Sequence, residues 1–503
     1  MTAQTDIAAG YASEGAALEL GAVLVDGTVD PAARVRVPLA TLNRHGLVAG
    51  ATGTGKTKTL QLVAEQLSAA GVPVVMADVK GDLSGLSQPG AANDRVTARA
   101  ADTGDDWRPA AFPVQFLSLG TGGSGVPVRA TITSFGPILL AKVLGLNDTQ
   151  ESTLGLIFHW ADQRGLPLLD TKDLRSVITH LTSEEGKADL KGLGGVSSAT
   201  AGVILRSLVN LEAQGGDTFF GEPELDPRDL MRVSDGRGVV SLLELAELQS
   251  KPALFSTFLM WLLAELFQEL PEEGDLDQPK LVFFFDEAHL LFADASKAFL
   301  EQITQTVKLI RSKGVGVFFC TQLPTDVPNS VLSQLGARVQ HALRAFTPED
   351  QAALAKTVKT YPTSPHYDLE KALTSLGIGE AVVTVLSEKG APTPVAWTRL
   401  RAPRSLMDTI GADAIKQAAD ASELNGKYAE TIDRESAYEK LAAKVAPPAE
   451  APPPQQGSER AEEPGVVEKV LGNSAVKSFL RSAASALGRE ITRGIFGTAR
   501  KRR

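Results

Sequence analysis

The octapeptide GATGTGKT, residues 50–57, constrains this chain more than any other stretch. It fits the phosphate-loop pattern G-x-x-x-x-G-K-[ST] at every required position. Glycines let backbone N–H groups turn inward around phosphate oxygens, and a following helix adds the positive end of its dipole. The run HGLVAG before the loop predicts a strand, and KTKTLQLVAEQL predicts that helix. Because strands and helices go on alternating to residue 119, we expect a parallel α/β sheet.

The loop predicts a nucleotide site. Lys56 would place its charge on the β and γ phosphates, and Thr57 would offer its hydroxyl to Mg²⁺. A chance glycine-rich turn is the alternative, but the strand before the loop and the helix after it favour nucleotide binding. The predicted nucleotide-binding residues are Gly50, Ala51, Thr52, Gly53, Thr54, Gly55, Lys56, Thr57 and Lys58.

A second apolar strand ends abruptly in two acids, within KLVFFFDEAHLLF at residues 280–292. Charges belong at the carboxyl edge of a parallel sheet, where α/β proteins bind ligands. Asp286 is predicted to hold Mg²⁺, directly or through water, and Glu287 to polarise the attacking water. The alternative is a solvated strand boundary. Coupled to a phosphate loop, the pair predicts the second half of an ATPase site.

The strand GVGVFFCTQ, residues 314–322, ends with Thr321 and Gln322. If it lies beside the strand of Asp286, Gln322 faces the γ phosphate and orients the hydrolytic water; otherwise it only caps a strand. Cys320 is the single cysteine, which excludes an intramolecular disulfide and a cysteine-rich zinc site. We expect it to be a small buried hydrophobe.

Composition shifts divide the chain. Residues 1–40 predict a small N-terminal β segment, and 41–425 an α/β ATPase domain. Apolar residues at three- and four-residue spacing predict a helical insertion at about 135–235. Residues 426–465 predict a helix and then a Pro-rich linker, and 466–503 a basic amphipathic helical tail.

Composition also indicates the compartment and the partners. A hydrophobic content of 43% with 22% charged residues is typical of a soluble protein. The start of the chain lacks a secretion signal, and the apolar run at 253–267 is shorter than the ~20 residues of a membrane span. A single cysteine suits a reducing compartment. We therefore expect a cytoplasmic protein. Residues 466–503 hold nine Lys or Arg and two Glu, so this tail has a charge of +7. Because the net charge of the whole chain is -10, the rest of the chain has a charge of -17. An acidic body argues against a DNA-coating surface, but not against a narrow basic channel.

The motifs RHGLVAGATGTGKTKT, DVKGDLSG, FFFDEAHLLF, FFCTQ and GARVQHALRAFTPEDQ, in this order, resemble the HerA and FtsK superfamily of P-loop ATPases. The resemblance is strongest to the HerA-like helicase family of the YjgR type and covers about residues 15–410. It implies a RecA-like core with a large, mainly parallel sheet. It also implies a homo-oligomeric ring, usually a hexamer, with ATP and Mg²⁺ at subunit interfaces and DNA or another polymer in the pore.

The resemblance gives two arginines a role. The segment GARVQHALRAF alternates like a half-buried strand, and Arg338 on it looks like an arginine finger that reaches a neighbour's γ phosphate, with Arg344 as the second candidate. A planar guanidinium can bridge phosphate oxygens as charge builds in the transition state. One departure is TQLPTDVP, where HerA-type translocases often carry TQRPS and then a basic residue. Leu323 and Asp326 stand at those positions, so any arginine role located there is missing.

Three functions remain open at this point. The first is a ring-forming, ATP-driven translocase or helicase that acts on DNA. The second is an ATPase that remodels protein or works at a membrane surface, with the basic tail as tether to a membrane or protein partner. The third is an assembly protein that hydrolyses ATP slowly and switches shape, although Glu287 argues against a purely structural role. No winged-helix pattern or nuclease constellation is recognisable in the sequence.

Overall fold

The computed structural model describes residues 2–78, 81–190, 194–213, 215–244, 252–274, 276–293 and 295–445. Residues as far as Leu441 form one compact unit. The predicted Pro-rich linker and the basic tail lie outside the described residues from 446 onward. The described residues therefore comprise the N-terminal β segment, the α/β domain, the helical insertion and the helices that follow as far as Val445.

The described ranges build a twelve-stranded sheet with the order β2-β1-β14-β13-β12-β3-β11-β10-β4-β9-β5-β6. From β12 to β6 every neighbouring pair is parallel. Such strands are buried on both faces and therefore read as apolar runs in the sequence. They are β12 (Ala337–Gln340), β3 (Gly46–Ala49), β11 (Val315–Thr321), β10 (Leu281–Phe285), β4 (Val74–Asp78), β9 (Val240–Glu244), β5 (Val114–Leu119) and β6 (Val126–Val128). The predicted large, mainly parallel sheet is confirmed.

Antiparallel strands extend this sheet beyond β12. They are β13 (Glu380–Thr384), β14 (Ala396–Leu400), β1 (Ala17–Val25) and β2 (Thr28–Pro38). Asp26 and Gly27 join β1 to β2 with positive φ angles of 50° and 74°, the two-residue turn that matches the twist of a hairpin. The N-terminal β segment therefore adds two strands to the edge of the main sheet. A short separate hairpin pairs β7 (Val233–Ser234) with β8 (Arg237–Gly238).

Helices cover both faces of the sheet, and alternate residues of each strand face different cores. On β3, Val48 packs into a cluster with α2 (Lys56–Ala69), whereas Leu47 packs into the larger cluster with α10 (Pro252–Glu269) and α12 (Lys297–Ile310). The other helices outside the insertion are α1 (Ala3–Ala9), α3 (Asp94–Thr103), α11 (His289–Phe292), α13 (Asn329–Leu332), α14 (Pro348–Val358), α15 (Leu369–Ser375), α16 (Ala412–Asp420), α17 (Asn425–Tyr428) and α18 (Ala437–Val445). Among the described helices, none is both long and apolar enough to span a membrane.

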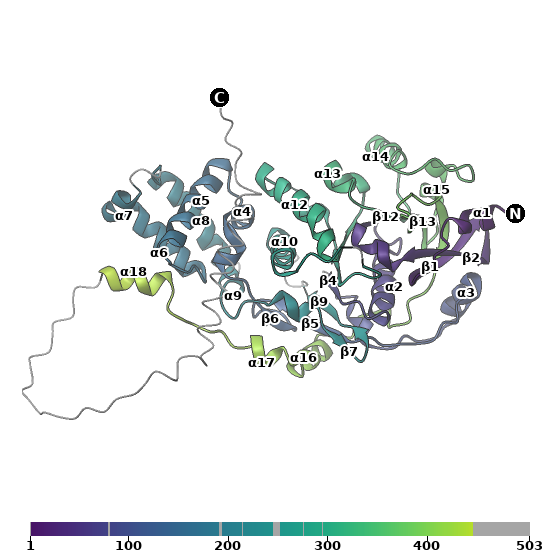
Figure 1. Ribbon diagram of the computed structural model, residues 1–503, viewed down its shortest axis with the longest axis horizontal. Helices are drawn as coiled ribbons and strands as arrows, with labels where there is room; N and C mark the ends of the chain where they lie inside the picture. The colour runs from purple at the N-terminus through teal and green to yellow at the C-terminus, as the bar shows by residue number, and fades with distance from the viewer. Residues whose placement is uncertain are drawn as a thin grey trace, which may run out of the picture. The chain divides into compact units, whose positions relative to one another are not determined.

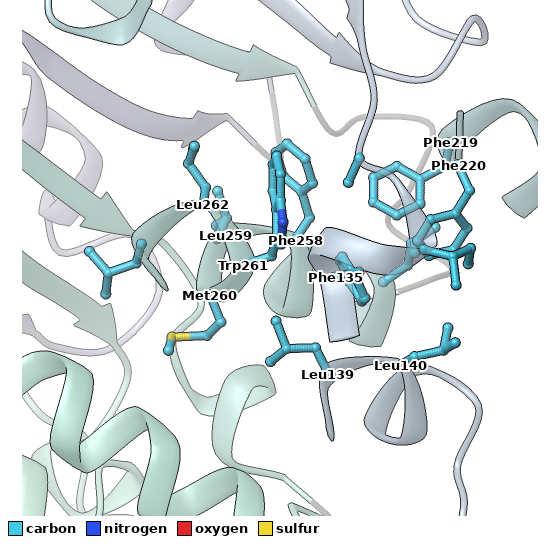
Figure 2. Close-up of a cluster of buried hydrophobic side chains, with 14 of the residues drawn as sticks. Phe135, Leu139, Leu140, Phe219, Phe220, Phe258, Leu259, Met260, Trp261 and Leu262 are labelled. Carbon is cyan, nitrogen blue, oxygen red and sulfur yellow. The ribbon is translucent and has the colours of Figure 1, made fainter. Parts of the chain in front are cut away.

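The helical insertion follows β6, and its helices gather beside that end of the sheet, opposite β1 and β2 (Figure 1). They are α4 (Ile132–Val143), α5 (Asp148–Gln163), α6 (Thr171–Thr182), α7 (Glu184–Asp189), α8 (Ser198–Ala213) and α9 (Gly216–Phe219). Figure 2 shows their contact with α10: Trp261 and Phe258 lie in one aromatic cluster with Phe135 and Phe219. The insertion therefore shares one apolar core with the sheet.

Candidate nucleotide site

The phosphate loop connects β3 to α2, and its backbone requires glycine. Gly50, Gly53 and Gly55 have φ angles of 153°, 79° and 109°, which side chains rarely tolerate. A Cβ on Gly50 would also lie 2.5 Å from the Cβ of His341. The loop therefore holds the shape that the motif predicts, with one wall made by a residue far along the chain.

The start of α2 is open to an anion. The N-cap of this helix is Gly55, which offers no side-chain cap, so the first-turn N–H groups keep their capacity for a ligand. The ammonium of Lys56 donates to the carbonyl oxygens of Gly50 at 2.7 Å and Ala51 at 3.3 Å. A cation over a loop of backbone amides fits the phosphates of a nucleotide.

The predicted acid pair lies at the carboxyl end of β10, next to β11 and one strand further from β3. Glu287 has a φ of 48°, a left-handed conformation that is costly for a residue with a side chain. Its N–H donates to Asp286 Oδ1 at 2.9 Å, and its Oε2 lies 3.4 Å from His289 Nδ1. Backbone strain of this kind concentrates at functional sites, which favours the catalytic interpretation over a solvated boundary.

The metal prediction rests on Thr57, the second residue of α2, and on Asp286, which directly follows β10. Among the described residues, no three His, Cys, Asp or Glu side chains gather as a metal site. Mg²⁺ does not require such a cluster, because it keeps waters and takes phosphate oxygens as ligands. Behind Asp286, the thiol of Cys320 is fully buried, and burial followed by the charge of Asp286 raises its pKa well above the usual value. Cys320 is thus the small buried group that we expected.

The strand of Gln322 satisfies the condition set from the sequence, since β11 lies between β3 and β10. Thr321 pairs with Ala49, the last residue of β3, so Gln322 follows at the level of the phosphate loop and is exposed. Asp326 accepts from the Thr321 hydroxyl at 2.7 Å and from the Leu323 N–H at 2.9 Å. The acid that replaces a basic residue of HerA-type translocases therefore closes the turn after this strand.

Arg338 lies on β12, beside Leu47 of β3 and short of the phosphate loop. Its guanidinium donates to the Thr360 carbonyl at 2.6 Å and the Leu332 carbonyl at 3.4 Å, and lies 5.8 Å from the ring centre of Tyr361. Each of these contacts is within one chain. The arginine-finger role of Arg338 stays a prediction.

Arg344 lies beyond the strand, next to the phosphate loop of its own chain. The sequence predicts one strand through Phe346, whereas β12 ends at Gln340. The chain leaves the sheet there because the Ala342 carbonyl accepts from Ala51 N–H at 2.8 Å. Arg344 is exposed, and its Nη2 donates to the Thr52 carbonyl at 3.3 Å. A role of Arg344 toward a neighbouring subunit also stays a prediction.

Lys58, in the first turn of α2, has several carboxylates nearby. Burial lowers its pKa, and the nearby carboxylates of Asp82 and Asp78 act in the opposite direction. Its Nζ donates to Gln61 Oε1 at 3.2 Å. Any contact of Lys58 with nucleotide phosphate is therefore expected to come from the backbone rather than from the ammonium.

Two further residues at this edge were not found from the sequence. Glu244 ends β9 opposite Asp78, and burial together with that carboxylate raises the pKa of Glu244 to about 7. The rule that singled out Asp286, a charge at the end of an apolar strand, would have found it. His341 is fully buried against the phosphate loop, and no local pattern marks it.

A phosphate loop on a central parallel strand, with an acid pair and a glutamine at the ends of the next two strands, defines a RecA-like P-loop NTPase. Within that class, this chain belongs to the HerA-like helicase family, because the family model described as "Helicase HerA-like C-terminal" matches residues 25–503. The resemblance to the HerA and FtsK superfamily is thereby confirmed. None of the curated proteins matches this sequence.

Solved structures show the same fold. The chain is similar to the bacterial conjugative coupling protein TrwBdeltaN70, at 15% identity and a TM-score of 0.51 over 81% of this chain and 95% of that one. It is also similar to the plasmid coupling protein TrwB in complex with ADP and Mg²⁺, at 15% identity and a TM-score of 0.52, with 81% and 95% covered. These likenesses confirm the RecA-like architecture.

Proposed function

We propose that this protein is an ATP-hydrolysing motor of the HerA type that assembles as a homo-oligomeric ring, usually a hexamer, with ATP at the subunit interfaces. The observation that carries the proposal is the carboxyl edge of β3, β11 and β10. It aligns the phosphate loop, Gln322 and the acid pair on adjacent strands. A small-molecule kinase would share the loop but would not need the acids and the glutamine together.

Each residue at this edge has a distinct task. The loop amides and Lys56 bind the β and γ phosphates, and Thr57 and Asp286 hold Mg²⁺. Bound Mg²⁺ would neutralise charge on the phosphate oxygens. Glu287 orients and polarises the water that attacks the γ phosphate, and Gln322 positions that water from the neighbouring strand. The TrwB complex with ADP and Mg²⁺ supports this choice of ligands on the same fold.

The proposed ring would bring an arginine of one subunit to the nucleotide site of the next. A guanidinium from a neighbouring subunit completes many P-loop sites. Exposed Arg344 already borders its own loop, whereas Arg338 lies short of that loop and could exchange its Thr360 and Leu332 carbonyls for a neighbour's phosphate. We therefore assign Arg338 to the neighbour's site and Arg344 to the site of its own chain.

DNA is the proposed polymer, in a cytoplasmic setting, on the strength of the HerA-like helicase family. The second candidate is remodelling of protein, or work at a membrane surface. One observation favours it: residues 466–503 carry a net charge of +7, and their apolar residues keep helical spacing with basic residues between them, which suits an anionic lipid surface.

The test is the ATPase rate of the full chain alone, with duplex DNA, with single-stranded DNA and with anionic vesicles. Stimulation by DNA that survives truncation after residue 465 would support the translocase. Stimulation by vesicles that is lost on truncation would support the membrane candidate instead. No ATP hydrolysis under any condition would overturn the proposal.

A further inference from the structure

His341 forms one wall of the phosphate loop. Its side chain is fully buried, and its N–H donates to the Ala49 carbonyl at 2.7 Å. The absent Cβ of Gly50 leaves the space that the His341 Cβ fills, and a Cβ on Gly55 would lie 3.7 Å from the imidazole. Both outer glycines of the loop therefore rest against this one side chain.

The imidazole also fixes the start of α2. His341 Nε2 lies 2.9 Å from the hydroxyl of Thr59, and both side chains are buried. The same hydroxyl donates to the Gly55 carbonyl at 3.3 Å. A hydroxyl has one hydrogen, so while it donates to Gly55 it accepts from an Nε2–H of His341. The chain of bonds runs from the imidazole through Thr59 to the N-cap of the helix that faces the phosphates.

The wall adds no charge to the site. Burial, followed by the nearby ammonium of Lys56, lowers the pKa of His341 to about 4, so the ring is neutral at pH 7. A neutral ring adds no further cation to Lys56 and Arg344, which both donate to carbonyls of the loop. It can therefore support the backbone without competing for phosphate oxygens.

From these contacts we propose that His341 is a positioning residue of the phosphate loop: it holds residues 50–55 and the first turn of α2 in their binding shape before the nucleotide arrives. The inference rests on the proposed function, since it presumes that the loop binds ATP. It predicts an effect on affinity more than on turnover, because bound phosphates can themselves restore the loop. Preorganisation of this kind strengthens binding by lowering its ordering cost.

The chain supplies a matched control at the other end of β3, the strand that leads into the phosphate loop. His45 directly precedes β3, is also buried, and has a pKa also lowered to about 4. Its Nε2 donates to the Val307 carbonyl at 2.7 Å, and its Nδ1 accepts from Val317 N–H at 3.0 Å. Replacing His45 therefore tests the cost of losing a buried imidazole without touching the phosphate loop.

The experiment measures the Kd of a fluorescent ATP analogue with Mg²⁺, together with KM, kcat and Tm, for the full-length protein and for H341A and H45A. Both variants are expected to lower Tm. Only H341A is expected to raise Kd and KM, by about tenfold, with kcat reduced less than about threefold. Equal Kd values in H341A and the unaltered chain, or equal increases in H341A and H45A, would overturn the inference.

Two milder variants keep the test usable if H341A does not fold. T59V removes the hydroxyl partner and keeps the shape, so Kd should rise in the same direction by about threefold. H341Q keeps a donor near the Nε2 position and should recover part of the affinity lost in H341A. An unchanged Kd in T59V would contradict the proposed chain of bonds. Absence of ATP binding in the unaltered chain would instead overturn the proposed function itself.

Discussion

Strand β3 has a buried, neutral histidine near each of its ends, yet the two ends are built for different purposes. At the amino end, the ring nitrogens of His45 bond to backbone groups of α12 and of the neighbouring strand β11. At the carboxyl end, His341 packs on a glycine loop and on the uncapped start of α2. A buried histidine therefore does not mark function here. The end that we assign to function is the one that leaves backbone N–H groups and a lysine for a ligand.

The strongest way to sharpen this comparison is to separate two arginines, Arg338 on β12 and Arg344 beyond its end. Arg338→Ala should lower the ATPase rate by about 1,000-fold or more, because a finger arginine stabilises charge in the transition state. Mixed rings of Arg338→Ala with Lys56→Ala subunits should recover activity, since each supplies what the other lacks. The measurement is the ATPase rate against mixing ratio.

Arg344→Ala is the matched partner in that experiment. Because Arg344 contacts Thr52 of its own loop, mixing with Lys56→Ala subunits should leave its defect in place. Rescue of Arg344→Ala, or failure to rescue Arg338→Ala, would reverse the two assignments.

The acid pair gives the next largest effect. Glu287→Gln should keep ATP binding and lower turnover by about 100- to 10,000-fold, because the amide cannot polarise the attacking water. Single-turnover hydrolysis alongside Kd separates these effects. Glu244→Gln, at the end of β9, serves as the control and should change turnover less than about threefold. Equal turnover in Glu287→Gln and the unaltered chain would remove Glu287 from catalysis.

Lys56→Ala probes binding at the carboxyl end alone. The loss of a charge-assisted contact to the β and γ phosphates should weaken ATP binding by about 100-fold, while Tm in the absence of nucleotide falls little. Isothermal titration with a non-hydrolysable ATP analogue measures this. Undiminished affinity would mean that the phosphates bind elsewhere.

The smallest effect, on stability against pH, is shared by both ends. The pKa of each histidine is lowered to about 4 in the folded chain, against 6.5 when unfolded. The unfolded state therefore binds the extra protons as pH falls from 6.5 toward 4, and the folded state loses stability over that window. Each histidine contributes up to about 3 kcal/mol to this loss of folding free energy. Urea unfolding should show that the free energy of unfolding falls less between pH 7 and pH 5 in H45A and in H341A than in the unaltered chain.

Much of this site could be predicted because its parts are local. The phosphate loop, the Asp286 strand and the Thr321 strand end each combine an apolar run with a fixed neighbour in sequence. The strand through Phe346 was predicted too long because alternation cannot show that the Ala342 carbonyl bonds to Ala51. His341 was missed for the same reason, since its partners lie near the other end of the domain. The end of β12 and the place of His341 are both set by contacts between segments that are distant in the sequence.

The antiparallel edge of the sheet has a consequence for how the chain is made. β1 pairs with β14 in the register Gly21↔Leu400, so a strand that leaves the ribosome early waits for one that leaves very late. At ordinary rates of synthesis that delay is on the order of tens of seconds. During it, the open side of the β1–β2 hairpin is an unpaired edge that other chains can join. Until Leu400 has emerged, the nascent chain should therefore need a chaperone, or an aggregation rate slower than its synthesis, in order to fold.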